Sequence, residues 1–207
     1  MTYPPAPWNL NGSALATFHL VDVERVRPLI PAELSIVSVF PGKTLGIVYF
    51  STYTRGSVLE YNELIVLPAL LTYKGKVGPW VSHIYVDNAD SVEGGREIWG
   101  LPKQLAEFTW SDAAVKVYQE GRDLCSLSFQ STWMQLPAEL QPSLMGLVFT
   151  QVGSALTWFD AQVQTQPAVI NGHLTVPASS PFKALDLSQP FLSVSAMDLK
   201  VKIQSPV

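Results

Sequence analysis

Short runs of β-branched and aromatic residues recur along the chain, and polar turn residues separate them. Such runs are typical of β-strands. They predict strands over 44–54, 63–73, 80–88, 115–119, 124–134 and 197–204. Turn chemistry lies between several of them, as at Pro41-Gly42-Lys43 and at 120–123. The pattern therefore predicts a mainly β (α+β) fold.

The arrangement of these strands is predicted from their close spacing. Together with 13 Gly and 16 Pro, this spacing favours an antiparallel sheet that closes or nearly closes on itself, which would remove vulnerable strand edges. Helices are few in the pattern. One is predicted from Asp22 up to Pro31, one over 90–100, and a third within 143–152.

Length and composition bound the organisation of the chain. A length of 207 residues suits one domain over 1–207, with a sizeable core. Hydrophobic residues make up 47% and charged residues only 14%. Strands buried on both faces, or a homo-oligomer that hides part of the surface, would account for this thin charge. The net charge of −4 and the lack of any Lys/Arg run argue against a nucleic-acid partner.

Other composition features predict a cytoplasmic protein. No stretch approaches the ~20 apolar residues that cross a bilayer, so no membrane span is expected. The N-terminal MTYPPAPW does not read as a secretory signal. Cys125 is the only cysteine, which excludes an internal disulfide and fits a reducing compartment. The three histidines have no Cys or His at ligand spacing, so neither a metal nor another cofactor is expected.

The most informative stretch for chemistry is 85–108, which holds Lys103. This lysine follows Pro102, which restricts the backbone, and Trp99 and Leu101 make its surroundings apolar. Burial disfavours the ammonium form of a lysine and leaves more neutral, nucleophilic amine. For an arbitrary lysine, a surface position with its stem along apolar neighbours is the commoner arrangement. The residues alone leave both interpretations open.

The same stretch resembles the active-site segment of acetoacetate decarboxylases. It contains Tyr85-Val86-Asp87-Asn88, then Gly95-Arg96-Glu97, then Pro102-Lys103, at that family's spacing. Upstream, Tyr61-x-Glu63 and Pro31-x-x-Leu34 are similar as well. The resemblance implies a cone-like closed sheet with a few peripheral helices, assembled as an oligomer, with the lysine inside the cone.

By this resemblance Lys103 is the catalytic residue, which forms a Schiff base with a carbonyl (keto) substrate. The protonated imine then accepts electrons, as in a decarboxylase or in an aldolase- or dehydratase-type lyase. Glu63 matches a family carboxylate that faces the site, although a structural salt bridge is an almost equal alternative. Arg96 and Glu97 are expected to be structural, as an ion pair or cap that shapes the loop.

Four further residues are expected to bind substrate. His83 alternates with apolar residues, so it is a candidate proton shuttle inside the cone, and Tyr85 would share its face. For His83 a hydrogen-bonded structural role is the commoner alternative. Trp99 and Leu101 would supply apolar wall.

Three features of the decarboxylases are missing. Gln104 stands where they carry a second lysine, and Val48 lies close to the position of a second glutamate. Their substrate-facing arginine aligns either with Ser13 or with no residue near it. A β-keto acid's carboxylate calls for a fixed cation. A neutral ketone or aldehyde, or a larger apolar substrate, therefore fits better than acetoacetate.

A non-enzymatic alternative also follows from resemblance. The N-terminal half, with PPAPWNLNGSAL and EYNELIVLPALL, is similar to the plant neoxanthin-deficiency proteins, which act in carotenoid metabolism. An apolar cone would then serve as a non-catalytic site for a hydrophobic small molecule. The presence of Lys103 favours the enzyme.

Overall fold

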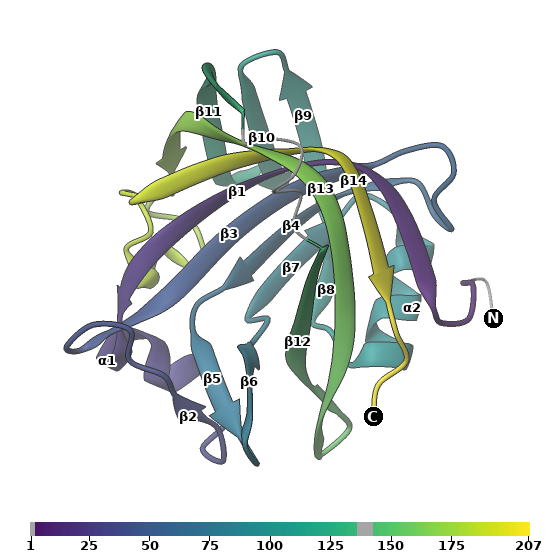
Figure 1. Cartoon of the computed structure of the whole chain (residues 1–207), viewed down its shortest axis with the longest axis vertical. Coiled ribbons are helices and arrows are strands. Elements are labelled where there is room, and N and C mark those ends of the chain that lie inside the picture. The colour runs from purple at the N-terminus through teal and green to yellow at the C-terminus, as the bar shows by residue number, and fades with distance from the viewer. Residues whose placement is uncertain (1–2, 136–142) are drawn as a thin grey trace.

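A computed structural model describes residues 3–135 and 143–207 of the chain, and its side chains outside 131–145. Most of the chain forms one 11-stranded sheet in the order β8-β7-β4-β3-β1-β14-β13-β11-β10-β9, with β12 paired to β13 (Figure 1). Its strands are β1 (Trp8–Asp22), β3 (Lys43–Tyr53), β4 (Tyr61–Leu67), β7 (His83–Val86), β8 (Lys103–Leu105), β9 (Glu107–Ser111), β10 (Ala114–Gln119), β11 (Arg122–Gln135), β12 (Ser143–Val152), β13 (Ala155–Thr175) and β14 (Leu192–Ile203).

The remaining elements lie around this sheet. A 3-stranded sheet has the order β2-β5-β6. The bounds are β2 (Ser35–Ile36), β5 (Leu70–Tyr73), β6 (Lys76–Pro79), α1 (Val23–Val26), α2 (Ala89–Trp99) and the 3-10 turns η1 (Arg27–Leu29) and η3 (Lys183–Leu185). None of the helices within the described ranges is long and apolar enough to span a membrane. The prediction of a mainly β fold with few helices is confirmed.

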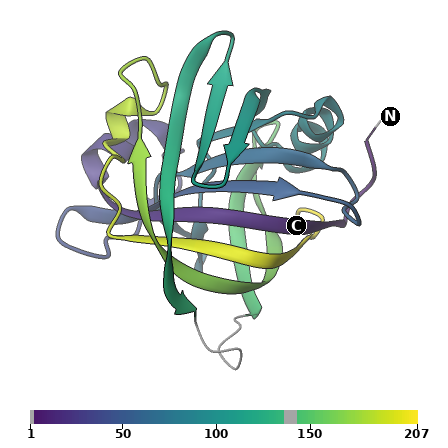
Figure 2. The same ribbon diagram turned by 90° about the horizontal axis from the view of Figure 1, so that it is seen from above.

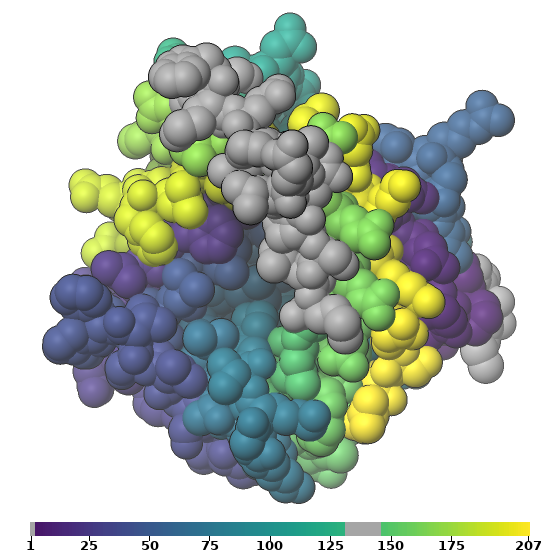
Figure 3. Space-filling view, viewed as in Figure 1, coloured from purple at the N-terminus to yellow at the C-terminus, as the bar shows by residue number. Residues whose placement is uncertain are grey.

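The large sheet curves strongly but is not closed by hydrogen-bonded ladders. Pairing is antiparallel except between β7 and β8, which are parallel. Over the described residues the ladder order ends at β8 and at β9. An isolated parallel bridge between Trp80 and Phe149 connects β12 to the segment between β6 and β7. The β5–β6 hairpin lies beside the β12–β13 hairpin at this point (Figure 3). The expected cone-like shape of the sheet is thus confirmed (Figure 2), whereas closure of the sheet by its ladders is not found over the described residues.

Both faces of the central strands are buried, which explains the low fraction of charged residues. On β3, Val48 and Phe50 pack into the largest apolar cluster, together with Leu64 of β4. The alternate positions Tyr49 and Tyr53 point to the opposite face, since successive side chains alternate along a strand. This second face carries the candidate site.

Helix α2 agrees with the sequence prediction. Its N-cap is Asn88, whose side-chain oxygen accepts a hydrogen bond from the backbone N–H of Ser91 at 3.0 Å. Gly100 ends the helix with a positive φ of 65°, the conformation that glycine adopts without strain. The helix predicted after Asp22 is shorter than expected: α1 covers four residues and passes into η1.

One sequence expectation was wrong in the C-terminal half. Residues 143–152 form strand β12, not a helix, and pair with β13 through a tight turn at Gly153, whose φ is 60°. The polar, proline-rich stretch 177–191 lies between β13 and β14. It buries Phe182, Leu185 and Leu187 in the largest apolar cluster. Spaced single hydrophobic residues in a loop give no periodic signal, so this packing was not visible in the sequence.

Candidate active site

The backbone that presents Lys103 is fixed on both sides. The N–H of Gly100 donates to the Arg96 carbonyl at 3.0 Å, and the N–H of Leu101 donates to the Gly95 carbonyl at 3.1 Å. Pro102 follows, and Lys103 begins β8, where it is paired with Ile84 of β7. The helix end, the proline and the parallel ladder together leave this lysine little freedom of position.

Helix α2 also holds Lys103 from the side. The Nε atom of Arg96 donates to the backbone carbonyl of Lys103 at 2.8 Å. Gly95 provides space for the lysine stem, because a Cβ atom at that position would lie 2.5 Å from Cδ of Lys103. Gly94 likewise leaves room for the Trp8 ring. The Gly95-Arg96 motif therefore positions the lysine in two ways: Gly95 leaves space for its stem, and Arg96 holds its backbone carbonyl by a hydrogen bond.

The amine of Lys103 is buried, with the residue only 2% exposed. Its Nζ atom donates to Oε1 of Glu63 at 2.9 Å and to Oγ of Ser91 at 2.9 Å. The same atom lies 5.6 Å from the centre of the Trp8 ring and 4.9 Å from that of Tyr61, within the range of cation–π attraction. These contacts fit a charged amine held at one point.

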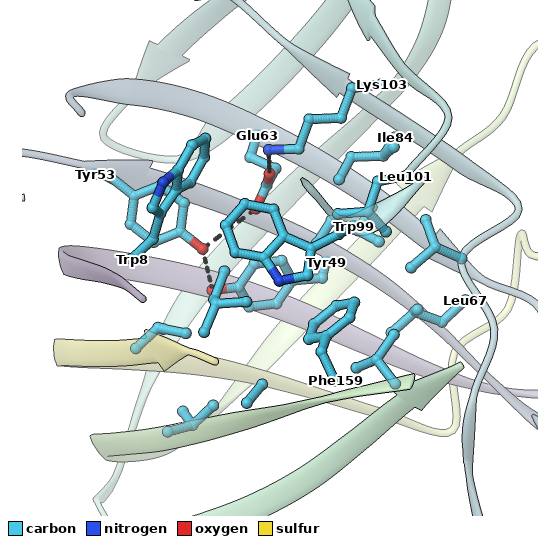
Figure 4. Close-up of a pocket in the computed structure, with 17 residues that line it drawn as sticks. Trp8, Tyr49, Tyr53, Glu63, Leu67, Ile84, Trp99, Leu101, Lys103 and Phe159 are labelled. Carbon is cyan, nitrogen blue, oxygen red and sulfur yellow. Dashed lines mark hydrogen bonds and ion pairs between the residues drawn. The ribbon is translucent and has the colours of Figure 1, made fainter. Parts of the chain in front are cut away.

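Glu63 links the lysine to a chain of tyrosine hydroxyls. Its Oε2 atom accepts a hydrogen bond from Tyr53 at 3.3 Å, and the Tyr53 hydroxyl lies 3.4 Å from that of Tyr49 (Figure 4). Burial raises the pKa of Tyr53 and of Tyr61 well above the ordinary value of a tyrosine, and the nearby Glu63 carboxylate adds to the shift. Both phenols therefore stay protonated and can act only as neutral hydrogen-bonding groups.

These polar groups border a cavity of about 200 Å³, here called the Lys103 cavity. Apart from Lys103, Glu63, Tyr49 and Tyr53, its wall is hydrocarbon or indole. Figure 4 shows Leu67 and Phe159 on the side away from Glu63. The cavity is lined by Trp8, Tyr49, Tyr53, Glu63, Ile65, Leu67, Val81, Ile84, Trp99, Leu101, Lys103, Val148, Phe159, Ala161, Val163, Val201 and Ile203.

Four of the eight residues predicted from sequence come together here: Lys103, Glu63, Trp99 and Leu101. The indole N–H of Trp99 donates to the backbone carbonyl of Gln204 at 2.7 Å, so this side chain offers the cavity only its apolar surface. Arg96 and Glu97 are exposed on α2, outside the lining.

His83 and Tyr85 lie elsewhere, which corrects the expectation that they face the cavity. In the β4–β7 pairing Glu63 stands opposite Val86 and Leu64 opposite Tyr85, so Tyr85 shares the face of Leu64. Tyr85 is buried in the largest apolar cluster. The side chain of His83 contacts the Ser82 hydroxyl at 2.9 Å and packs against the Phe182 ring. The expectation placed the wrong set of alternating β7 residues toward Lys103: Ile84, not His83, lines the cavity.

Several residues at the site were missed from the sequence. Ser91 contacts the lysine amine, but a serine in the first turn of a helix is usually read as a capping residue. Trp8, Tyr49 and Tyr53 line the cavity as well, although aromatic residues at such positions most often belong to the core. The sequence held a weak signal for this polar patch, because Tyr49, Ser51 and Tyr53 occupy every second position of one strand and so place three hydroxyls on the same face.

The positions that depart from the decarboxylase pattern add no charge to the cavity. Gln104 is exposed, and its side-chain oxygen accepts a hydrogen bond from Gln119 at 2.9 Å. Ser13 sits beside the irregularity in the β1–β14 pairing, and Val48 faces the largest apolar cluster. Among the described residues, no three His, Cys, Asp or Glu side chains are grouped so that they could hold a metal ion.

Comparisons with solved structures agree on the fold. Acetoacetate decarboxylase from Legionella pneumophila superposes with a TM-score of 0.78 at 17% identity, covering 100% of this chain and 88% of that one. The enduracididine biosynthesis enzyme MppR, solved with pyruvate, gives a TM-score of 0.69 at 15% identity over 99% of this chain and 90% of its own. At these identities the likeness concerns the fold.

Sequence relatives fall into two groups. Protein NEOXANTHIN-DEFICIENT 1 of Solanum lycopersicum is 34% identical over 107 residues, which are 52% of this chain and 36% of the relative. Acetoacetate decarboxylase of Ralstonia nicotianae is 29% identical over 106 residues, which are 50% of this chain and 40% of the relative. The matches thus span about two fifths of these relatives. The family model for acetoacetate decarboxylase matches residues 1–166, and the chain therefore belongs to the acetoacetate decarboxylase family.

Proposed function

We propose that the protein is an enzyme that forms a Schiff base between Lys103 and a carbonyl compound. The observation that supports this most strongly is the amine of Lys103, which is buried at the wall of an apolar cavity and held 2.9 Å from a carboxylate. A lysine that served only to neutralise Glu63 would need no adjoining cavity of about 200 Å³.

The pair with Glu63 supplies a way to free the amine. Transfer of one proton from Nζ to the Glu63 carboxylate converts two buried charges into two neutral groups, which a dry site tolerates better than separated charges. The neutral amine attacks the carbonyl carbon. The proton returns from Glu63 to the oxygen of the carbinolamine, which leaves as water. One ammonium and one carbonyl thus give one protonated imine and one water.

The protonated imine accepts an electron pair from the neighbouring carbon. This pair is released either by loss of CO₂ or by removal of a proton, and Glu63, 2.9 Å from the amine, is the group proposed to accept that proton. A lyase of the decarboxylase or of the aldolase and dehydratase type follows. The names of the similar proteins support both: two are acetoacetate decarboxylases, and one solved form of MppR holds the condensation product of pyruvate and an aldehyde.

A non-catalytic role is the second candidate. The similarity to NEOXANTHIN-DEFICIENT 1 proteins supports it, as does the almost entirely apolar wall of the Lys103 cavity. In this case Lys103 and Glu63 would be a structural ion pair, and the cavity would bind a hydrophobic small molecule.

Reductive trapping separates the two candidates. Incubation with a ketone and borohydride should add one adduct per chain, located by peptide mapping at Lys103 and lost in Lys103→Gln. Lys74, an exposed lysine, provides a matched control through Lys74→Gln, which should label like the wild type. Adducts scattered over surface lysines, with none at Lys103, would exclude the enzyme and favour the binding role.

We also expect the protein to work in the cytoplasm and to assemble with copies of itself. The low charge of the chain and exposed side chains such as Phe40, Phe191 and Met197 support assembly. Light scattering on the purified protein would measure the number of subunits.

A further inference from the structure

The Lys103 cavity has no cation to spare for a negatively charged substrate. Lys103 is the only Lys or Arg among the described residues that line it, and its amine is already paired with Glu63. The sequence from 131 to 145, whose side chains are not described, contains no Lys, Arg or His. A substrate carboxylate bound here would therefore lack an opposite charge from the wall.

Cations on neighbouring elements point away from the cavity. Arg96 is exposed and donates to the backbone carbonyl of Lys103 from outside the lining. On β14, Val201 and Ile203 line the Lys103 cavity, whereas Lys200 and Lys202 alternate with them and line a separate hollow. Strand alternation thus keeps two nearby lysines on the opposite face of the sheet.

The other charged group that faces the cavity, the Glu63 carboxylate, has the same sign as the carboxylate of a substrate acid. Glu63 is 3% exposed, and a second carboxylate beside it would add like-charge repulsion to the cost of desolvation. The hydroxyls that might compensate are engaged, since Tyr53 contacts Glu63 and Tyr49 contacts Tyr53. A neutral carbonyl group avoids both costs, because it needs only Lys103 and one hydrogen-bond donor.

The rest of the cavity suits a hydrocarbon group. Leu67 and Phe159 lie away from Glu63 (Figure 4), and Val148 and Ala161 belong to the same wall. A volume of about 200 Å³ exceeds the ~150 Å³ at which an engineered apolar cavity in another protein holds benzene. A ring or a medium-length chain therefore fits beside the reacting carbonyl.

We propose that the substrate of the Lys103 site is an uncharged ketone or aldehyde that carries a hydrocarbon group of about benzyl size and no carboxylate. This inference rests on the proposed Schiff-base chemistry. The carbonyl group lies at the cavity wall beside the Lys103–Glu63 pair, and the hydrocarbon group packs toward Leu67, Phe159 and Val148. Burial of that group provides most of the binding free energy.

Three methyl ketones test this pose by the rate of borohydride-trapped adduct at Lys103. Benzylacetone is neutral and carries a ring, levulinate carries a carboxylate, and acetone carries neither. Benzylacetone should label Lys103 at least about tenfold faster than levulinate, with acetone between them. Levulinate labelling as fast as benzylacetone overturns the substrate class and leaves the Schiff-base function intact. No adduct at Lys103 with any of the three overturns the function itself.

A cavity-filling variant tests where the hydrocarbon group lies. Ala161→Leu should slow labelling by benzylacetone about tenfold or more and leave acetone within about twofold, because only the larger ketone needs that space. Equal slowing of both ketones would contradict the pose.

A second variant tests the role of charge. Val163→Lys adds a cation to the cavity wall and should raise the labelling rate of levulinate relative to that of benzylacetone. An unchanged ratio of the two rates would show that charge is not what excludes the acid.

Discussion

The Nζ atom of Lys103 lies 2.9 Å from Oε1 of Glu63, and both side chains are almost fully buried. Removal of one partner from such a pair leaves an uncompensated charge in an apolar site, which costs about 3–5 kcal/mol. We therefore expect Glu63→Met to lower the free energy of unfolding by roughly that amount, measured by urea denaturation. The double variant Glu63→Met, Lys103→Met should be clearly more stable than the single one. Equal stability of the two variants would show that the pair is not coupled.

Gly95 is expected to be indispensable for the position of the lysine. A methyl group at this site would overlap the Lys103 stem, and overpacking of this kind costs about 1–3 kcal/mol. Gly95→Ala should also slow adduct formation at Lys103 strongly. Gly146→Ala is the matched control, because no atom lies within 4 Å of its added Cβ. If Gly95→Ala labels at the wild-type rate, the proposed role of α2 is refuted.

Arg96 and Glu97 are adjacent exposed residues with different expected roles. Arg96→Ala removes the hydrogen bond to the Lys103 carbonyl and should slow trapping severalfold, while binding of an apolar dye in the cavity stays unchanged. Glu97→Ala should match the wild type in both assays. Arg96→Lys should not restore the rate fully, since a lysine lacks the guanidinium geometry. Equal effects of the two alanine variants would count against a positioning role.

The sequence predicted the segment around the candidate site better than it predicted the strands. The end of helix α2 and the approach to Lys103 were predicted well, because the helix-ending Gly100 and Pro102 are local signals, whereas the cap at Asn88 was not predicted. Glu63, the ion-pair partner of Lys103, was identified only through family resemblance, since it lies 40 positions away along the chain. His83 shows the limit of sequence prediction, because the register of a strand decides which alternate residues face the cavity and the sequence does not fix that register.

The two longest strands, β1 and β13, were missed as well. The first five residues of β1 include two Asn and one Gly, and β13 contains a Gly and a Pro among several Gln, so neither strand has strong strand propensity throughout. Their pairing comes from tertiary contacts.

Stability should fall on mild acidification. Burial lowers the pKa of His19 from 6.5 to about 4, so between these values the unfolded chain binds a proton that the folded chain does not. Stability is then lost as the pH falls from 6.5 toward 4, by up to about 3 kcal/mol from this residue. Urea midpoints across this range should show the slope. His19→Gln should flatten it, leaving the contribution of His83, whose pKa is lowered by burial too. An unchanged slope in His19→Gln would contradict the assignment.

Exchange of the carbonyl oxygen tests the central claim, that Lys103 forms a reversible Schiff base. Each cycle of imine formation and hydrolysis replaces the oxygen of the ketone by one from water. Benzylacetone in ¹⁸O-labelled water should therefore gain the label much faster with the wild-type protein than with Lys103→Gln, as measured by mass spectrometry. If the wild type and Lys103→Gln exchange at the same rate, Lys103 does not form the imine, and the account given for this site is wrong.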